Sequence, residues 1–169
     1  MLDTIVRYLH DSLMPFRLAS YPSMEHLPRA AQPTPKHAVL VETRLVLVAD
    51  KLALLCHASS DHVDLAALSN TLEAPVVDAE HDDLPEALKR YEAPPPPLGQ
   101  LFGIPLIVDE KVPGYASIVF QPFGESDFIE IPYEDLARQE APRIASFARA
   151  GELRAARGAS TRGAPAEPR

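Results

Sequence analysis

One short segment of the chain contains every side-chain type of a hydrolase triad. His57, Ser59, Ser60, Asp61 and His62 supply imidazole, hydroxyl and carboxylate groups almost side by side. A triad needs these groups to converge in space, usually from distant chain positions, and no G-x-S-x-G elbow surrounds either serine. The segment therefore favours a turn and a helix N-cap over a serine nucleophile.

Metal and cofactor chemistry has equally little support. His81-Asp82-Asp83 could ligate a metal, but adjacent side chains rarely face one point, so a helix cap is favoured. The sequence contains no H-E-x-x-H, no Walker loop and no G-x-G-x-x-G. The single cysteine, Cys56, lies in the apolar run LALLC and is predicted to be a core residue. We expect neither a metal nor a cofactor.

Glu42-Thr43-Arg44 is a different kind of cluster, because it separates the apolar runs at 38–41 and 45–48. Charged residues in such a place must reach solvent, pair with each other or line a cavity. The pattern leaves two interpretations open, a strand end at the surface and a pocket wall.

The segment YEAPPPPLGQLFGIPLIVDE, residues 91–110, holds four consecutive prolines followed by Leu98-Gly99 and an apolar run. Proline fixes its own φ and restricts the residue before it, so Pro94 to Pro97 should form a stiff polyproline wall. Gly99 lets the chain turn or lets another group approach the backbone. The alternatives are the rim of a small pocket and a plain Pro-rich linker.

Helical spacing of apolar residues predicts helices over 2–13, over 65–72 and over 84–91. A further helix should open at Pro132, continue past Pro142 through Ile144 and Phe147, and end at Gly151. The expected N-caps are Ser60 or Asp61 for the second helix, Asp82 or Asp83 for the third, and Ser23 for a short helix over 24–31.

Continuous apolar runs at 38–41, 45–48 and 52–55 predict central strands buried on both faces, with a hairpin turn at Ala49-Asp50-Lys51. Shorter strands are expected at 16–19, 76–77, 104–108, 115–120 and 128–131, with a turn at Pro113-Gly114. Strands that alternate with helices in this way predict a mixed α/β domain around one sheet.

Length and charge narrow the function further. A chain of 169 residues favours one domain. The net charge is −8, and the acidic body argues against a broad basic face for nucleic acid. Residues 138–169 hold seven arginines against three glutamates, so this end could touch phosphate or could be a solvated tail.

No apolar run approaches the roughly 18 residues of a membrane span, and Asp3 is unlike a secretion signal. A cytoplasmic protein is expected.

Several segments occur in the order typical of one family. HVDLAALSNTL is followed by the loop Pro96-Pro97-Leu98-Gly99, then by GIPLIVDEKV with its Asp109, then by a strand that leads to Gly124, and last by Asp135-Leu136. Over roughly residues 1–150 the chain resembles the YbaK / prolyl-tRNA synthetase-associated editing domain family. The resemblance implies a single α/β domain at 1–150, and residues 151–169 are expected to form a mobile tail.

Members of that family hydrolyse the ester of mischarged aminoacyl-tRNA, as a second sieve for errors that binding alone rejects poorly. The resemblance therefore implies a trans-acting aminoacyl-tRNA deacylase whose partners are the tRNA 3′ end and an aminoacyl-tRNA synthetase. In the family a strand lysine and a Gly-x-x-x-Pro loop line the pocket. Here Glu42 stands at the lysine position, Ala93 at the glycine and Pro97 at the proline.

The site implied by the resemblance has two parts. Thr43 and Arg44 are the candidates for holding water or the terminal ribose-phosphate. The substrate-binding candidates are Glu42, Ala93, Pro96, Pro97, Gly99 and Gly124, with Gly124 as a source of backbone donors. Because Glu42 inverts the family charge, a catalytically degenerate domain with a binding or regulatory role is the alternative, and an unrelated small-molecule or peptide pocket is a third.

Overall fold

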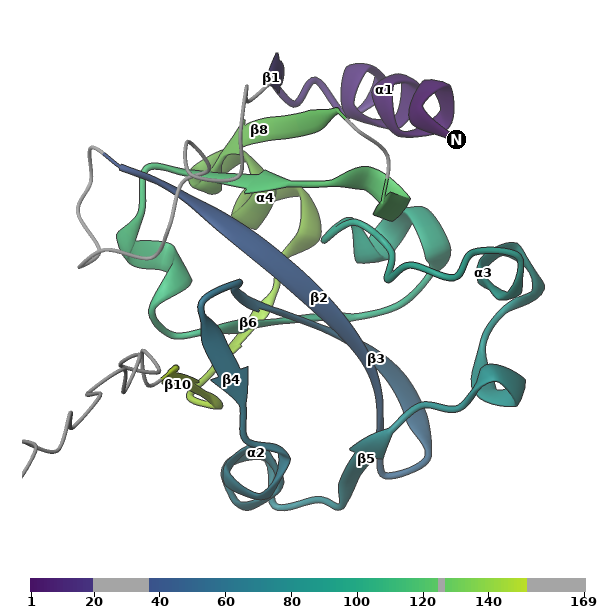
Figure 1. The fold of residues 1–169 in the computed structure, drawn as a ribbon, viewed down its shortest axis with the longest axis vertical. Helices are drawn as coiled ribbons and strands as arrows, with labels where there is room; N and C mark the ends of the chain where they lie inside the picture. Colours follow the sequence, from purple (N-terminus) through teal and green to yellow (C-terminus); the bar gives the residue numbers. More distant parts are fainter. Residues whose placement is uncertain (20–36, 125–126, 152–169) are drawn as a thin grey trace, which may run out of the picture.

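A long hairpin of strands β2 (Ala38–Val48) and β3 (Lys51–Ala58) organises the sheet. The computed structural model describes residues 1–19, 37–124 and 127–151 (Figure 1). The predicted turn is confirmed: Ala49 and Asp50 have positive φ angles of 46° and 63°, as a type I′ hairpin requires. Glu42-Thr43-Arg44 does not end the strand, since β2 runs through it without a break.

The main sheet is mixed, with the order β1-β8-β7-β2-β3-β6-β9 and with β5 also paired to β2. The pairs β2–β7, β3–β6 and β6–β9 are parallel, and the remaining pairs are antiparallel. Two further strands, β4 and β10, form a small antiparallel sheet. The other strands are β1 (Arg17–Ala19), β4 (Asp61–Val63), β5 (Val76–Asp78), β6 (Leu106–Asp109), β7 (Ser117–Phe120), β8 (Phe128–Pro132), β9 (Arg143–Ala145) and β10 (Ala148–Ala150).

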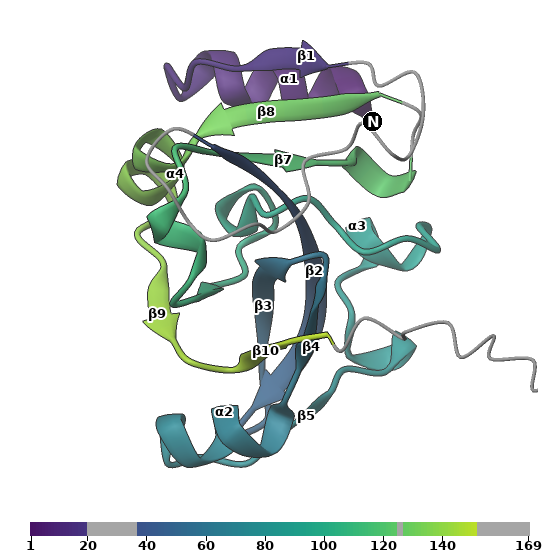
Figure 2. The ribbon, with the colours of Figure 1, turned by 60° about the vertical axis from the view of Figure 1, so that its left-hand side comes forward.

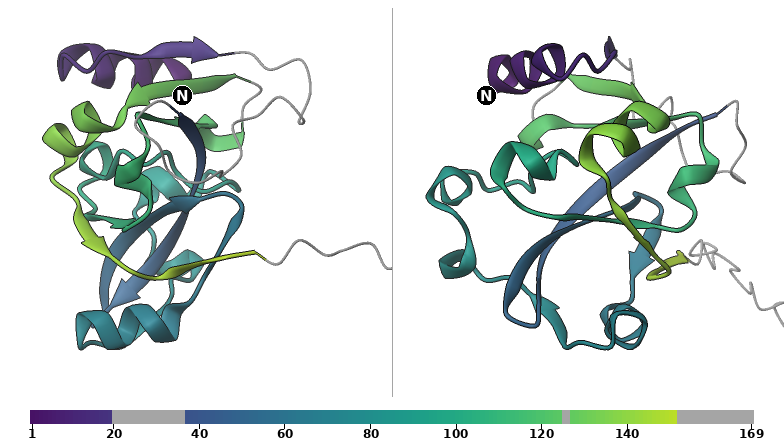
Figure 3. Two further views of the ribbon diagram at one scale, coloured as in Figure 1. Left: turned by 90° about the vertical axis from the view of Figure 1, so that its left-hand side faces the viewer. Right: turned by 180° about the vertical axis from the view of Figure 1, so that it is seen from behind.

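Helices cover both faces of this sheet. The larger core includes Ile5 and Leu9 of α1 (Leu2–Asp11) and Leu136 of α4 (Tyr133–Glu140). A second core on the other face of β3 holds Leu68 of α2 (Leu65–Leu72) together with Phe147. Helices α1 and α2 lie at opposite ends of the molecule (Figures 2 and 3). The structure confirms the predicted single mixed-sheet α/β domain with helices packed around a central sheet.

Short helical turns connect these elements. The third helix is shorter than predicted, because His81–Asp83 form a separate turn, η2, and α3 (Glu86–Lys89) starts only after Pro85. The remaining turns are η3 (Gly99–Phe102), η4 (Val112–Gly114) and η5 (Pro122–Gly124). The expected short helix over 24–31 and most of the tail at 151–169 lie outside the described residues.

The N-cap predicted for α2 is wrong. Asp64 caps the helix, and its carboxylate accepts a hydrogen bond from Ala67 N at 2.9 Å. Ser60 lies in the preceding turn, and Asp61 begins β4. Asp61 is almost fully buried and pairs with Lys111, so its carboxylate has another partner.

The predicted continuation of the last helix is also wrong. Helix α4 ends at Glu140, Ala141 takes a left-handed conformation, and Ile144 lies in a strand instead. Pro142 disfavours helical geometry at the residue before it and lacks the N–H that a helix would use. The carboxylate of Asp109 then accepts hydrogen bonds from Phe147 N at 3.0 Å and Ala148 N at 2.8 Å. This contact holds the segment in its extended path.

Candidate active site

Strand β2 changes its neighbour halfway along one edge. Residues 38–40 pair with β7, and residues 46–48 pair with β5. On this edge Leu45 O accepts a hydrogen bond from Ala79 N at 3.1 Å. Alternate residues of a strand direct their backbone polar groups to the same edge, so Val41 and Thr43 direct theirs into the interval between β7 and β5.

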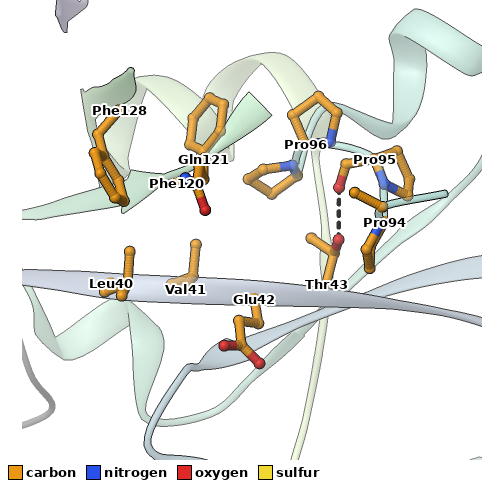
Figure 4. Close-up of a pocket in the computed structure, with 12 residues that line it drawn as sticks. Leu40, Val41, Glu42, Thr43, Pro94, Pro95, Pro96, Phe120, Gln121 and Phe128 are labelled. Carbon is orange, nitrogen blue, oxygen red and sulfur yellow. Dashed lines mark hydrogen bonds between the residues drawn. The ribbon is translucent and has the colours of Figure 1, made fainter. Parts of the chain in front are cut away.

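The proline loop at residues 93–97 fills this interval. Thr43 Oγ1 donates a hydrogen bond to Pro95 O at 2.5 Å, which ties the loop to the middle of the strand (Figure 4). Hollows lie on both sides of this contact, and both are lined by Thr43 and by residues 93–95. The predicted pocket rim is therefore present, whereas a plain linker would have no such anchor.

The first pocket has a volume of about 340 Å³. Its walls are residues 40–43 of β2, residues 93–97 of the loop, and Phe120, Gln121 and Phe128. Thr43 points toward the loop and Val41 toward Gln121, whereas the Glu42 side chain extends on the opposite side of the strand (Figure 4). Glu42, Ala93, Pro96 and Pro97 thus line one cavity together with Thr43, whereas Gly99, another predicted binding residue, is not among its lining residues.

The proline loop offers this pocket no hydrogen-bond donor from its four prolines. Proline has no backbone N–H, so Pro94 to Pro97 present carbonyl oxygens alone. Pro95 O accepts from Thr43, and Pro96 O accepts from Leu98 N at 2.7 Å. Within the described residues, the carbonyls of Pro94 and Pro97 have no hydrogen-bond partner. The loop is therefore a surface of acceptors.

Gln121 is a residue that the sequence reasoning missed. It follows β7, is exposed, and carries a carboxamide that can donate hydrogen bonds into the pocket. In Figure 4 the carboxamide lies between the end of β7 and β2. Within the described part of the chain, the pocket-lining side chains that can donate are Gln121 and Thr43, and Thr43 already donates to the loop. A polar residue directly after a buried strand was the available signal.

Gly99 follows the proline loop in the chain and is buried. A Cβ at this position would overlap the carbonyl oxygen of Ile104, so the close approach requires glycine. The buried carboxylate of Glu140 accepts hydrogen bonds from Gln100 N at 2.9 Å and from the Tyr8 hydroxyl at 2.8 Å. Burial raises the pKa of Glu140, although these hydrogen bonds oppose the rise. The proline loop is thus braced by α1 and α4.

Arg44 lies in the second pocket, which also has a volume of about 340 Å³. Its guanidinium donates twice to Asp78, from Nε to Oδ1 and from Nη2 to Oδ2, each at 2.6 Å. This hydrogen bonding lowers the pKa of the Asp78 carboxyl. Leu84, Leu88 and Tyr91 add an apolar wall to the same hollow. Arg44 is therefore beside the first pocket and not in it.

Of the remaining candidates, His57, Asp61 and Cys56 do not line either pocket. Gly124 ends the turn η5, which follows Gln121 in the chain. His57 is buried, with Nδ1 at 2.8 Å from Ala58 O, and Asp61 pairs with Lys111. The triad-like segment therefore forms a turn between β3 and β4, as the structural interpretation expected, but it does not cap a helix. Cys56 is fully buried, and burial raises the pKa of its thiol to about 12, which fits a core residue.

No group of side chains in residues 1–19, 37–124 and 127–151 could hold a metal ion. In the same ranges, no helix combines the length and apolar character needed to cross a membrane.

Solved structures share this fold at low sequence identity. A proposed trans-editing enzyme for prolyl tRNA synthetase is 13% identical with a TM-score of 0.59, and the match covers 87% of this chain and 96% of that one. A hypothetical protein is 15% identical with a TM-score of 0.62, covering 86% and 99% of the two chains.

A proposed signal transduction protein from Marinobacter aquaeolei VT8 is 18% identical with a TM-score of 0.63. The match covers 86% of this chain, which spans only 30% of that protein's length. No protein-family model matches the chain, and no curated protein matches it. At these identities the likeness concerns the fold, so the chain has the mixed α/β fold that these proteins share.

Proposed function

We propose that the protein is a trans-acting hydrolase of the ester bond in mischarged aminoacyl-tRNA. The observation that carries this proposal is the pocket between residues 40–43 of β2 and the proline loop. A proposed editing enzyme with the same fold adds support. The pocket has about 340 Å³, which lies near the lower end of the roughly 300–1,000 Å³ typical of ligand sites. A small aminoacyl group suits that size.

The chemistry needs few groups. Water adds to the ester carbonyl carbon, the bond from that carbon to the ribose oxygen breaks, and the ribose oxygen gains a proton. The protein must position the water and donate hydrogen bonds to the carbonyl oxygen as it becomes negative. Gln121 can supply those donors from its carboxamide. The lone pairs of Thr43 Oγ1 can accept a hydrogen bond from the water while the Thr43 hydroxyl donates its own hydrogen bond to Pro95 O.

The second pocket would take the tRNA end next to the ester. It shares Thr43 and residues 93–95 with the first pocket, so a ligand can extend from one to the other. Arg44 supplies the positive charge of this pocket. The Asp78 carboxylate would compete with a phosphate of the tRNA for the Arg44 guanidinium. Both side chains are substantially exposed, at 41% and 56%, so this pair can be exchanged for a phosphate at small cost.

Arg44 and Asp78 should have opposite effects on substrate binding. We expect Arg44→Ala to raise KM for aminoacyl-tRNA by about tenfold with kcat nearly unchanged, because a ground-state contact is lost. Asp78→Asn should lower KM, because it removes the competitor. Steady-state kinetics at low salt measures both values. If both substitutions changed KM equally and in the same direction, the second pocket would not be the site that binds the tRNA end.

A panel of mischarged tRNAs tests the function itself. We expect the purified full chain to hydrolyse at least one member at least ten times faster than buffer does, with release of the free amino acid. Hydrolysis no faster than buffer across the whole panel would rule out the enzyme.

A catalytically degenerate domain is the second candidate, and Glu42 is the observation that favours it. The first pocket has no cation among its described lining residues, although the family holds a lysine in this place. This candidate predicts tRNA binding that weakens with salt, without hydrolysis of any panel member. Filter binding beside the hydrolysis assay separates the two candidates.

A further inference from the structure

We propose that Phe123 is the positioning residue for Gln121, and that it acts through three aromatic rings that fix the turn η5 against the proline loop. The inference rests on the proposed function, in which the Gln121 carboxamide donates to the carbonyl oxygen of the ester. Phe123 is not among the described residues that line either pocket. Any effect of Phe123 on the reaction must therefore pass through its neighbours.

Tyr91, Phe102 and Phe123 form an aromatic cluster at the two ends of the proline loop. The centroid of the Phe123 ring lies 4.1 Å from that of Tyr91, with 32° between the planes, and 5.9 Å from that of Phe102, edge to face at 89°. Tyr91 precedes the loop, and Phe102 lies in η3 after it. Edge-to-face ring pairs add to the stabilisation that buried apolar area provides, and Phe123 also packs against the larger core. Its side chain therefore joins η5 to both ends of the loop.

The backbone of Phe123 has an uncommon conformation. Its φ of 49° and ψ of 33° lie in the left-handed region, which a Cβ disfavours. Glycine adopts this conformation readily, whereas a bulky residue keeps it only where the surrounding structure holds it. The contacts of the aromatic cluster supply that hold. We therefore expect η5 to relax to other geometries when the ring is removed.

Gln121 is the single residue between β7 and this turn. The buried Phe120 ends β7 before it, and the buried Pro122 begins η5 after it. The direction of the Gln121 carboxamide therefore depends on η5 as well as on the strand. Thr43 is tied to the same proline loop by its hydrogen bond to Pro95 O. The aromatic cluster thus places Gln121 relative to the loop that also holds Thr43, the other group of the proposed reaction.

Backbone dynamics measured by NMR test the inference without any hydrolysis. In the full chain, the N–H order parameter of Gln121 should be close to the roughly 0.85 of rigid backbone, and in Phe123→Ala it should fall below about 0.6. Phe16→Ala is the matched control and should retain the wild-type value. Phe16 is also half-buried against the larger core, but among the described residues it lines neither the first nor the second pocket.

The inference is overturned if Phe123→Ala leaves the order parameter of Gln121 unchanged, or if Phe16→Ala lowers it equally. If Phe123→Ala does not fold, Phe123→Leu takes its place, because leucine keeps apolar bulk but has no ring. A wild-type order parameter in that variant would overturn the inference as well.

Kinetics with a mischarged tRNA separates positioning from a general loss of stability. Misplacing a catalytic group by about 1 Å can cost about 100-fold, so Phe123→Ala should lower kcat at least tenfold, with a smaller change in KM. Adding Phe123→Ala to Gln121→Ala should reduce kcat by no more than about a further twofold, because the group that Phe123 positions is already absent.

Losses that multiply in the double variant, or a Phe123→Ala enzyme with wild-type kcat, would overturn the inference and leave the proposed function standing. If the wild-type chain hydrolyses no mischarged tRNA, the proposed function fails. The order parameter of Gln121 then decides by itself whether Phe123 holds this residue in place.

Discussion

Gln121→Ala should lower kcat for ester hydrolysis by roughly 100- to 1,000-fold, the usual cost of losing one donor to a developing oxyanion. The reason is the scarcity of side-chain donors in the first pocket, where the four prolines have no N–H and the Thr43 hydroxyl donates to Pro95 O. KM should change little, because the contact strengthens only in the transition state. Single-turnover kinetics with a mischarged tRNA gives the chemical step directly.

Gln100→Ala is the control for this substitution. Gln100 is also an exposed glutamine, but its side chain donates to Gln139 O at 2.6 Å and its backbone holds Glu140. The backbone contact survives the change, so kcat should stay within about twofold of wild type. A Gln121→Ala enzyme with wild-type kcat would show that the oxyanion is stabilised elsewhere.

Asp109→Ala should reduce the free energy of unfolding by roughly 3–5 kcal/mol, because buried N–H groups left without an acceptor each cost about 1–3 kcal/mol. Asp109 is 1% exposed and accepts hydrogen bonds from Phe147 N, Ala148 N and Lys111 N, at 3.0, 2.8 and 3.2 Å. The change should therefore release the segment that carries β9 and β10. Urea unfolding measures it as a lower midpoint.

Asp127→Ala provides the comparison, since Asp127 is exposed and precedes β8. It should shift the free energy of unfolding by no more than about 0.5 kcal/mol. Equal effects of the two substitutions would mean that Asp109 does not anchor the C-terminal segment.

Local patterns were enough to predict much of the fold. Residues 53–58 of β3 are buried on both faces as predicted, whereas in β2 only Val39, Val41 and Val46 are buried. The predicted turn at Ala49-Asp50 joins the two strands. The predictions were wrong for elements whose structure depends on residues far away in the sequence. The apolar residues Ile144 and Phe147 have helical spacing, but the carboxylate of Asp109 captures the backbone beside Phe147, and no local pattern reveals that contact.

The candidate site, like the fold, has features that local patterns predict and features that depend on tertiary contacts. The proline loop and Glu42-Thr43-Arg44 were recognisable from residue types, and the structure brings Thr43 to Pro95. The separation of Arg44 from the first pocket depends on Asp78 of β5, which pairs with β2 only in the folded sheet. Gln121 reaches the pocket because β7 is parallel to β2 and ends beside the loop. Both positions depend on tertiary contacts, so the spacing of residues along the chain could not predict them.

The most direct test of the account is hydrolysis of mischarged tRNAs by the wild-type chain and by Gln121→Ala in parallel. The account predicts release of the amino acid from at least one tRNA at ten or more times the buffer rate, with roughly a 100-fold loss or more in the variant. Release at the buffer rate from every tRNA by the wild-type chain would contradict it.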